Sequence, residues 1–182
     1  MPDVGETLLA LARNAINVRL GQPMTVVADH PALHENGATF VTLTQHGNLR
    51  GCIGSLVAWR PLSKDVQENA LAAAFRDPRF RPLSADELPG TRVEVSLLSP
   101  AEPMSFTSEA DALAQLRPEI DGVIFAAGNH RATFLPQVWE QLPDPVSFMA
   151  HLKQKAGLPA DYWGRDVRLE RYHVQKWKEN PC

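Results

Sequence analysis

Cys52 is the residue of this sequence best suited to chemistry, and it lies in the hexapeptide Leu-Arg-Gly-Cys-Ile-Gly at residues 49–54. Side chains alternate along a regular strand, so Arg50, Cys52 and Gly54 are expected on one face. A guanidinium beside a thiol favours the nucleophilic thiolate, and Gly51 and Gly54 would let a ligand or a partner backbone come close. The alternative is that Cys52 is a small buried hydrophobe and that the glycines mark a bulge or a tight backbone contact.

Arginines crowd the segment around Asp77, where Arg76 and Arg79 flank the Asp77-Pro78 pair. Together with Arg50 they are candidates for a local basic patch, joined by Arg60 and Arg81. A small anionic ligand, a carboxylate or a phosphate, would suit such a patch. The alternative is the end of a helix, where arginines offset the negative dipole and pair with Asp77.

Polar residues on two further segments are candidate partners of Cys52. Glu94 and Ser96 share the polar face of an alternating stretch, where Glu94 is a candidate catalytic base and Ser96 a hydrogen-bonding group. Asp121 and Thr133 are further candidates for ligand or partner binding. For all four residues the alternative is the solvated face of an antiparallel sheet.

The sequence offers no pattern for a resident metal or nucleotide. His30 and His34 have four-residue spacing, but Pro31 between them disfavours the helix that would bring them together. No glycine-rich phosphate-binding loop occurs. We therefore expect no metal site and no cofactor.

Composition describes an ordinary globular protein of 182 residues, with 44% hydrophobic and 21% charged residues. The net charge of −3 gives no general attraction to nucleic acids or anionic lipids, and no apolar run is long enough to span a bilayer. The two cysteines, Cys52 and Cys182, do not form the pattern of a disulfide-stapled secreted domain. We expect one cytoplasmic domain over residues 1–182, with both thiols reduced and with neither nucleic acid nor a membrane as its partner.

The elements that position these residues follow from periodicity and turn signals. Hairpins alternate with helices, which predicts a mainly antiparallel α+β fold with flanking helices. Helices are expected over residues 6–20, 61–76, 108–116 and 144–156, with a capping box at 84–87. Strands are expected over residues 38–45, 49–56, 93–97, 120–127, 131–135 and 167–177.

The hexapeptide at 49–54 resembles the signature of the AMMECR family, whose bacterial and archaeal members are called protein A of the AmmeMemoRadiSam system. The resemblance continues through five further segments in the family's order, namely 76–80, 93–96, 121–123, 132–138 and 155–158. It therefore covers nearly the whole chain. Arg81 departs from the family's pattern, in which proline is expected.

The resemblance implies an α+β domain of two closely packed lobes with a cleft beside the hexapeptide. It also implies a pathway shared with a Memo-type protein and a radical S-adenosylmethionine (SAM) protein. Two functions stay open at this point. One is a cysteine-dependent component that binds a ligand or substrate, and the other is a non-catalytic adaptor that binds the Memo-type partner through the same cleft.

Overall fold

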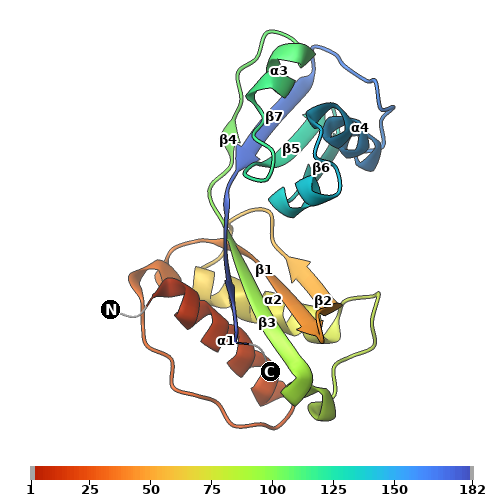
Figure 1. Ribbon diagram of the computed structural model, residues 1–182. Coiled ribbons are helices and arrows are strands. Elements are labelled where there is room, and N and C mark those ends of the chain that lie inside the picture. Colours follow the sequence, from red (N-terminus) through yellow and green to blue (C-terminus); the bar gives the residue numbers. More distant parts are fainter. Residues whose placement is uncertain (1–2, 181–182) are drawn as a thin grey trace. The chain divides into compact units, whose positions relative to one another are not determined.

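The computed structural model describes residues 3–180, which divide into two compact units (Figure 1). The first unit comprises the chain up to Leu98 and again from Gln175 onward, and the second runs from Ser99 to Val174. The second unit is thus a continuous segment inserted between two strands of the first. Each unit has its own sheet and its own hydrophobic core.

The first unit is an antiparallel sheet covered by two helices. Its strand order is β2-β1-β3-β8, with β1 at Ala38–Gln45, β2 at Asn48–Gly54, β3 at Thr91–Leu98 and β8 at Val174–Lys178. Helices α1 (Val4–Arg19) and α2 (Leu62–Phe75) pack together and against the sheet (Figure 1). The fully buried residues Val41, Val93 and Val95 face these helices, so the opposite face of the sheet carries the alternate residues.

The second unit repeats this arrangement on a smaller scale. Its sheet has the order β4-β7-β5-β6, formed by Glu102–Pro103, Val167–Tyr172, Gly122–Ala127 and His130–Phe134 respectively. Helices α3 (Glu109–Gln115) and α4 (Pro145–Lys155) contribute to its core, in which Trp139 stacks on Phe148 with ring centroids 3.8 Å apart. Short 3₁₀ helices lie at Pro31–His34, Ala85–Gly90 and Pro136–Glu140.

The predicted fold class is confirmed, because both sheets are antiparallel and helices flank them. Local signals account for this agreement. Ser84 and Glu87 form the predicted capping box, and the Asp144 side chain accepts the Val146 N–H at the start of α4. Gly128 and Gly157 adopt positive φ at the turn between β5 and β6 and after α4.

The expected single strand over residues 167–177 is wrong. The chain leaves the second sheet after Tyr172 and joins the first sheet at Val174. At the change of sheet, the His173 N–H donates to Ser99 Oγ at 2.7 Å and the Ser99 N–H donates to the His173 carbonyl at 2.8 Å. Nothing in the local sequence marks this change, because β-prone residues continue on both sides of it.

No helix within residues 3–180 has the length and apolar character needed to cross a membrane. Cys52 is a free thiol, whereas the expectation for Cys182 lies outside the described residues.

The close approach of β2 to α2 predicts the cost of a side chain at Gly51. A Cβ there would lie 2.1 Å from the backbone carbonyl oxygen of Ala73, which cannot move without shifting the helix. We expect Gly51→Ala to lower the free energy of unfolding by about 2–3 kcal/mol, measured by urea denaturation followed by circular dichroism. The control is Gly90→Ala, where nothing lies within 4 Å, and its effect should stay within about 1 kcal/mol of zero. Equal stability of the two variants would contradict the prediction.

Candidate functional site

Cys52 is held by its backbone at the edge of the first sheet. Its N–H donates to Asp77 Oδ2 at 3.0 Å, and its carbonyl oxygen accepts a hydrogen bond from Arg79 Nη2 at 3.2 Å. Among the described strands, β2 pairs with β1 alone, so outward-facing groups such as these would otherwise be open to solvent or to another chain. The turn after α2 therefore closes the sheet edge at Cys52.

Asp77 and Arg79 form the ion pair that makes this clamp. Arg79 Nε and Nη2 donate to the two carboxylate oxygens at 3.0 and 2.7 Å, and the Arg79 N–H adds a bond of 3.1 Å. Asp77 is only 3% exposed, and its hydrogen bonds from Arg79 hold the pKa of its carboxyl far below the usual range. The same contact raises the pKa of Arg79, and the charge of Cys52 adds a smaller effect in that direction. The clamp is thus a charged pair at neutral pH.

The thiol of Cys52 is half-buried and contacts the hydroxyl of Thr42, with Sγ and Oγ1 3.3 Å apart. Thr42 on β1 lies directly opposite both Cys52 on β2 and Glu94 on β3, so all three share one face of the sheet. Glu94 is therefore two strands from Cys52, about 10 Å between Cα atoms. Its carboxylate pairs with Lys178 Nζ at 3.4 Å, so the polar group next to the thiol is Thr42.

The adjacent row of the same face consists of Gly54, Phe40 and Ser96, paired across the three strands. A Cβ at Gly54 would lie 2.2 Å from the Phe40 ring, so glycine is needed for the ring to lie flat there. Ser96 is 6% exposed. These three residues together with Cys52, Thr42 and Glu94 define what we call the Cys52 face.

Arg50 does not share this face, contrary to the alternation expected from the sequence. The pairing of β1 with β2 shifts register between Leu43 and Thr44, which leaves Arg50 as the extra residue of a β-bulge. Its guanidinium is buried and donates to Glu87 through Nε at 2.8 Å and to the Arg81 carbonyl through Nη2 at 2.9 Å. The guanidinium that contacts Cys52 is instead that of Arg79.

Glu87 holds the Arg50 end of β2. It accepts hydrogen bonds from Arg50, from Gln45 Nε2 and from the Ser84 N–H. These bonds, that of Arg50 above all, lower the pKa of Glu87 to about 2. The Arg81 backbone takes part through its carbonyl, so the departure from proline at this position leaves that contact intact.

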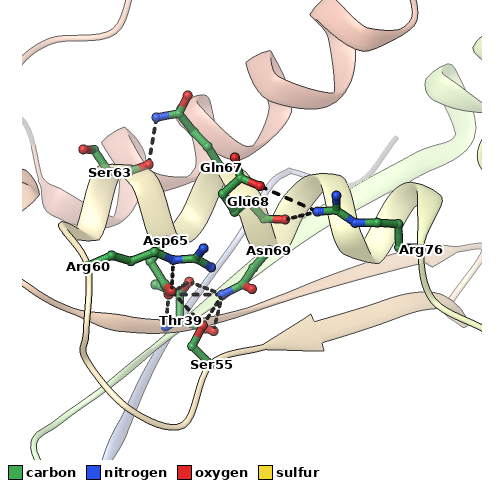
Figure 2. Close-up of polar contacts among 9 residues, drawn as sticks. All are labelled: Thr39, Ser55, Arg60, Ser63, Asp65, Gln67, Glu68, Asn69 and Arg76. Atoms are coloured by element: carbon green, nitrogen blue, oxygen red, sulfur yellow. Dashed lines mark hydrogen bonds and ion pairs between the residues drawn. The ribbon is translucent and has the colours of Figure 1, made fainter.

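Asp65 anchors the other end of β2, where Ser55 follows Gly54 (Figure 2). The fully buried Asp65 carboxylate accepts hydrogen bonds from Ser55 Oγ at 2.7 Å and from Arg60 Nε at 2.9 Å. It also accepts from both the N–H and the hydroxyl of Thr39, at 2.8 Å each. Asn69 donates to Thr39 and Ser55 and completes the network. Three carboxylates, from Glu87, Asp77 and Asp65, therefore fix the hexapeptide strand along its length.

The remaining candidates from the sequence lie in other surroundings. Arg76 is exposed and pairs with Glu68 across one side of α2 (Figure 2). Asp121 and Thr133 belong to the second unit. Asp121 pairs there with Arg117 at 2.8 Å, and the Thr133 hydroxyl donates to the Val123 carbonyl at 2.9 Å and contacts Tyr172. Among residues 3–180, no three histidine, cysteine or acidic side chains gather as a metal site would need.

Comparison with known proteins places this architecture in a family. The AMMECR1 family model matches residues 9–177. This chain belongs to the AMMECR1 family. A protein of Methanothermobacter thermautotrophicus is 38% identical over 183 residues, covering 98% of this chain and 95% of the relative. One from Methanocaldococcus jannaschii is 34% identical over 180 residues, covering 96% and 90%. The crystal structure of an uncharacterised Pyrococcus horikoshii protein matches with a TM-score of 0.84 at 33% identity, covering 97% of this chain and 92% of the other.

Sequence reasoning missed three residues that shape the site of this AMMECR1-family chain. Thr42, Asp65 and Glu87 act across sequence separations of 10, 10 and 37 residues, on Cys52, Ser55 and Arg50 respectively. Glu87 carried a signal, since it completes the capping box with Ser84, but that signal does not name Arg50 as its partner. Thr42 follows from the register of the hairpin, which the bulge obscures.

The lowered pKa of Glu87 predicts a pH dependence of stability. The carboxyl titrates near 4.5 when unfolded and near 2 when folded, so the unfolded state binds more protons between these values. The stabilisation is therefore complete above about pH 4.5 and is lost as the pH falls toward 2. Glu87→Gln should lose stability at neutral pH and show a shallower decline between pH 5 and about 2.5, measured by urea unfolding at each pH.

The matched control is Ser84→Ala, which removes a hydroxyl beside Glu87 but keeps the titrating carboxylate and Arg50. We expect this variant to keep the wild-type pH slope. A wild-type slope in Glu87→Gln would show that this carboxyl does not titrate as the structure indicates.

Proposed function

We propose that this protein is a ligand- or substrate-binding component that uses Cys52 as its reactive group, in a pathway shared with a Memo-type protein and a radical SAM protein. One observation carries the proposal. The N–H and the carbonyl of Cys52 are fixed by Asp77 and Arg79, whereas its thiol is half-buried and, among residues 3–180, has Thr42 as its polar contact. A reactive group held on a rigid element with a free reacting atom is the arrangement that a binding or catalytic site requires.

The charges around the thiol define the ligand chemistry of this proposal. Arg79 places a guanidinium at the Cys52 carbonyl, and about half of its side chain is exposed. It places a donor of positive charge next to Cys52 and attracts a small anionic ligand. The Thr42 hydroxyl shares a hydrogen bond with Cys52 Sγ and orients the sulfur. Glu94, beyond Thr42 and balanced by Lys178, acts on the ligand, and Ser96 with Gly54 borders the same face. Membership of the AmmeMemoRadiSam protein A group, together with the cleft and the cytoplasmic location, belongs to this proposal.

Alkylation of Cys52 by iodoacetamide tests the reactive-thiol proposal. In the reaction the thiolate sulfur bonds to the methylene carbon and iodide leaves. In a Cys182→Ser background we expect Cys52 to react faster than a free model thiol at neutral pH, by mass-spectrometric time course. Arg79→Gln should slow the reaction by about 3- to 10-fold, because it removes the positive group that holds the Cys52 backbone next to the reacting sulfur.

The matched control is Arg76→Gln, at an exposed arginine that pairs with Glu68 rather than with the Cys52 clamp. It should leave the rate unchanged, as should Arg50→Leu provided that the variant folds. If Cys52 reacts only after unfolding, the proposal of a reactive thiol is wrong.

The second candidate function is a non-catalytic adaptor that binds the Memo-type partner, and a loop directly after the hexapeptide favours it. Leu56, Val57 and Trp59 are exposed by 40%, 57% and 64% of their surface. Asp65 holds both ends of this loop through Ser55 and Arg60 (Figure 2). The Arg60 guanidinium lies 4.7 Å from the centre of the Trp59 ring. Ordered apolar groups of this kind are typical of interaction surfaces.

Paired substitutions distinguish the two functions. Under the adaptor function, Val57→Asp should weaken binding to the Memo-type protein at least tenfold in isothermal titration calorimetry, whereas Cys52→Ser should not. Val146→Asp, at a similarly exposed valine of α4 in the second unit, is the control and should bind as the wild type does. Unchanged binding in Val57→Asp would exclude this loop as the docking element.

A further inference from the structure

A groove in the second unit opens where β4 parts from β7. The two strands are paired only at Glu102 with Arg171 and at Pro103 with Glu170, and one more hydrogen bond joins the Met104 N–H to the Leu169 carbonyl at 2.8 Å. Beyond this point the chain turns away toward α3. The start of β7 therefore pairs with β5 on one side, and no described strand lies on its other side.

Two adjoining hollows of about 420 and 520 Å³ occupy this place. Both are lined by Phe106, Arg165 and Val167, and we call the two together the β4–β7 groove. Each hollow has the volume of a typical small-molecule site, of the order of 300–1,000 Å³. All lining residues belong to the second unit.

Aromatic and aliphatic side chains give the groove an apolar body. The rings of Phe106 and Trp163 lie 5.4 Å apart between centroids, tilted by 57°. Trp163 also contacts Lys153, whose ammonium lies 5.4 Å from the ring centroid and pairs with Glu109 at 3.1 Å. Lys153 is 1% exposed, so the aromatic wall rests on a fixed support.

The charges of the groove select for an anion. Arg165 is exposed, lines both hollows and has no ion pair or hydrogen bond with any described residue. Arg168 lines the larger hollow and has a single long contact, 3.5 Å from its Nη2 to the Gly128 carbonyl. Glu170 is the one acidic residue in the lining, so the positive charges outnumber it. A guanidinium without a carboxylate partner, beside an apolar groove, complements a carboxylate attached to an apolar group.

We infer that the β4–β7 groove binds a small carboxylic acid with an aromatic or acyl body, whose carboxylate pairs with Arg165 while its apolar part lies against Phe106 and Trp163. This site is independent of the function proposed for Cys52. It requires no residue of the first unit.

Benzoate and its neutral analogue benzamide test the inference on the full chain by nitrogen-15 NMR titration at constant ionic strength. We expect benzoate to shift the Trp163 indole signal and the backbone signals of residues 104–108 and 163–168 in a saturable way. A fragment of this size should bind with a dissociation constant of about 1–10 mM. Benzamide should bind at least fivefold more weakly, because it lacks the charge that pairs with Arg165.

Substitution of Arg165 separates a built site from adventitious binding. Arg165→Gln should weaken benzoate about fivefold or more and leave benzamide unchanged. Arg131→Gln, at another exposed arginine of the second unit that does not line the groove, should leave both ligands unaffected. Equal affinity for benzoate and benzamide, wild-type benzoate binding in Arg165→Gln, or shifts that do not map to this groove would each overturn the inference. If a peptide bound through its C-terminal carboxylate over tenfold more tightly than benzoate, the small-acid inference would be overturned, and the occupant would be the C-terminus of a protein chain.

Discussion

The edge of the first unit's sheet depends on two hydrogen bonds at Cys52, whose N–H donates to Asp77 and whose carbonyl oxygen accepts from Arg79. An edge strand exposes donors and acceptors that invite pairing with other chains, and proteins usually blunt such edges. Here the blunting is done by a charged pair rather than by another strand. Burying the Asp77 carboxylate costs desolvation, which is offset only when its hydrogen-bonding capacity is used. Both carboxylate oxygens of Asp77 accept hydrogen bonds, from the Arg79 side chain, the Arg79 N–H and the Cys52 N–H. The clamp therefore fixes the backbone position of Cys52.

The same logic extends along the whole hexapeptide. Glu87 holds Arg50 at the bulge, and Asp65 holds Ser55 beyond Gly54, so three separate acidic groups position six consecutive residues. Gly51 allows close approach to the α2 backbone, and Gly54 allows the Phe40 ring to lie across the strand. Stability alone does not require these carboxylates, because apolar side chains of similar shape at this edge would avoid the cost of desolvating them. Together the three carboxylates fix the position of Cys52 on its strand, while its thiol keeps Thr42 as its polar contact among the described residues.

The sequence predicts those parts of the structure that depend on interactions between residues close together in the chain. The strand expected over residues 38–45 has the same bounds as β1, and helices begin at the caps Ser84 and Asp144 that the spacing indicates. What escapes prediction is set by contacts between distant residues. The bulge at Arg50 depends on Glu87, 37 residues away, and it reverses the facing inferred from simple alternation. The change of sheet at His173 depends on Ser99, 74 residues away. Arginines 50, 60, 76 and 79 form a patch in the sequence, yet in space each has its own carboxylate.

The second unit is inserted in the chain between β3 and β8, and this sets the order in which the residues of the Cys52 face can come together during folding. Residues 99–174 are contiguous and can form their local hairpin and helices as they are synthesised, whereas the first unit requires a strand from the end of the chain. That strand is followed by Glu179, whose carboxylate accepts hydrogen bonds from Arg13 on α1 and from the Val93 N–H on β3. It also brings Lys178 to Glu94. Strands β1, β2 and β3 with α2 can therefore position Cys52 and Thr42 early, while the charge balance at Glu94 is set only when the chain returns.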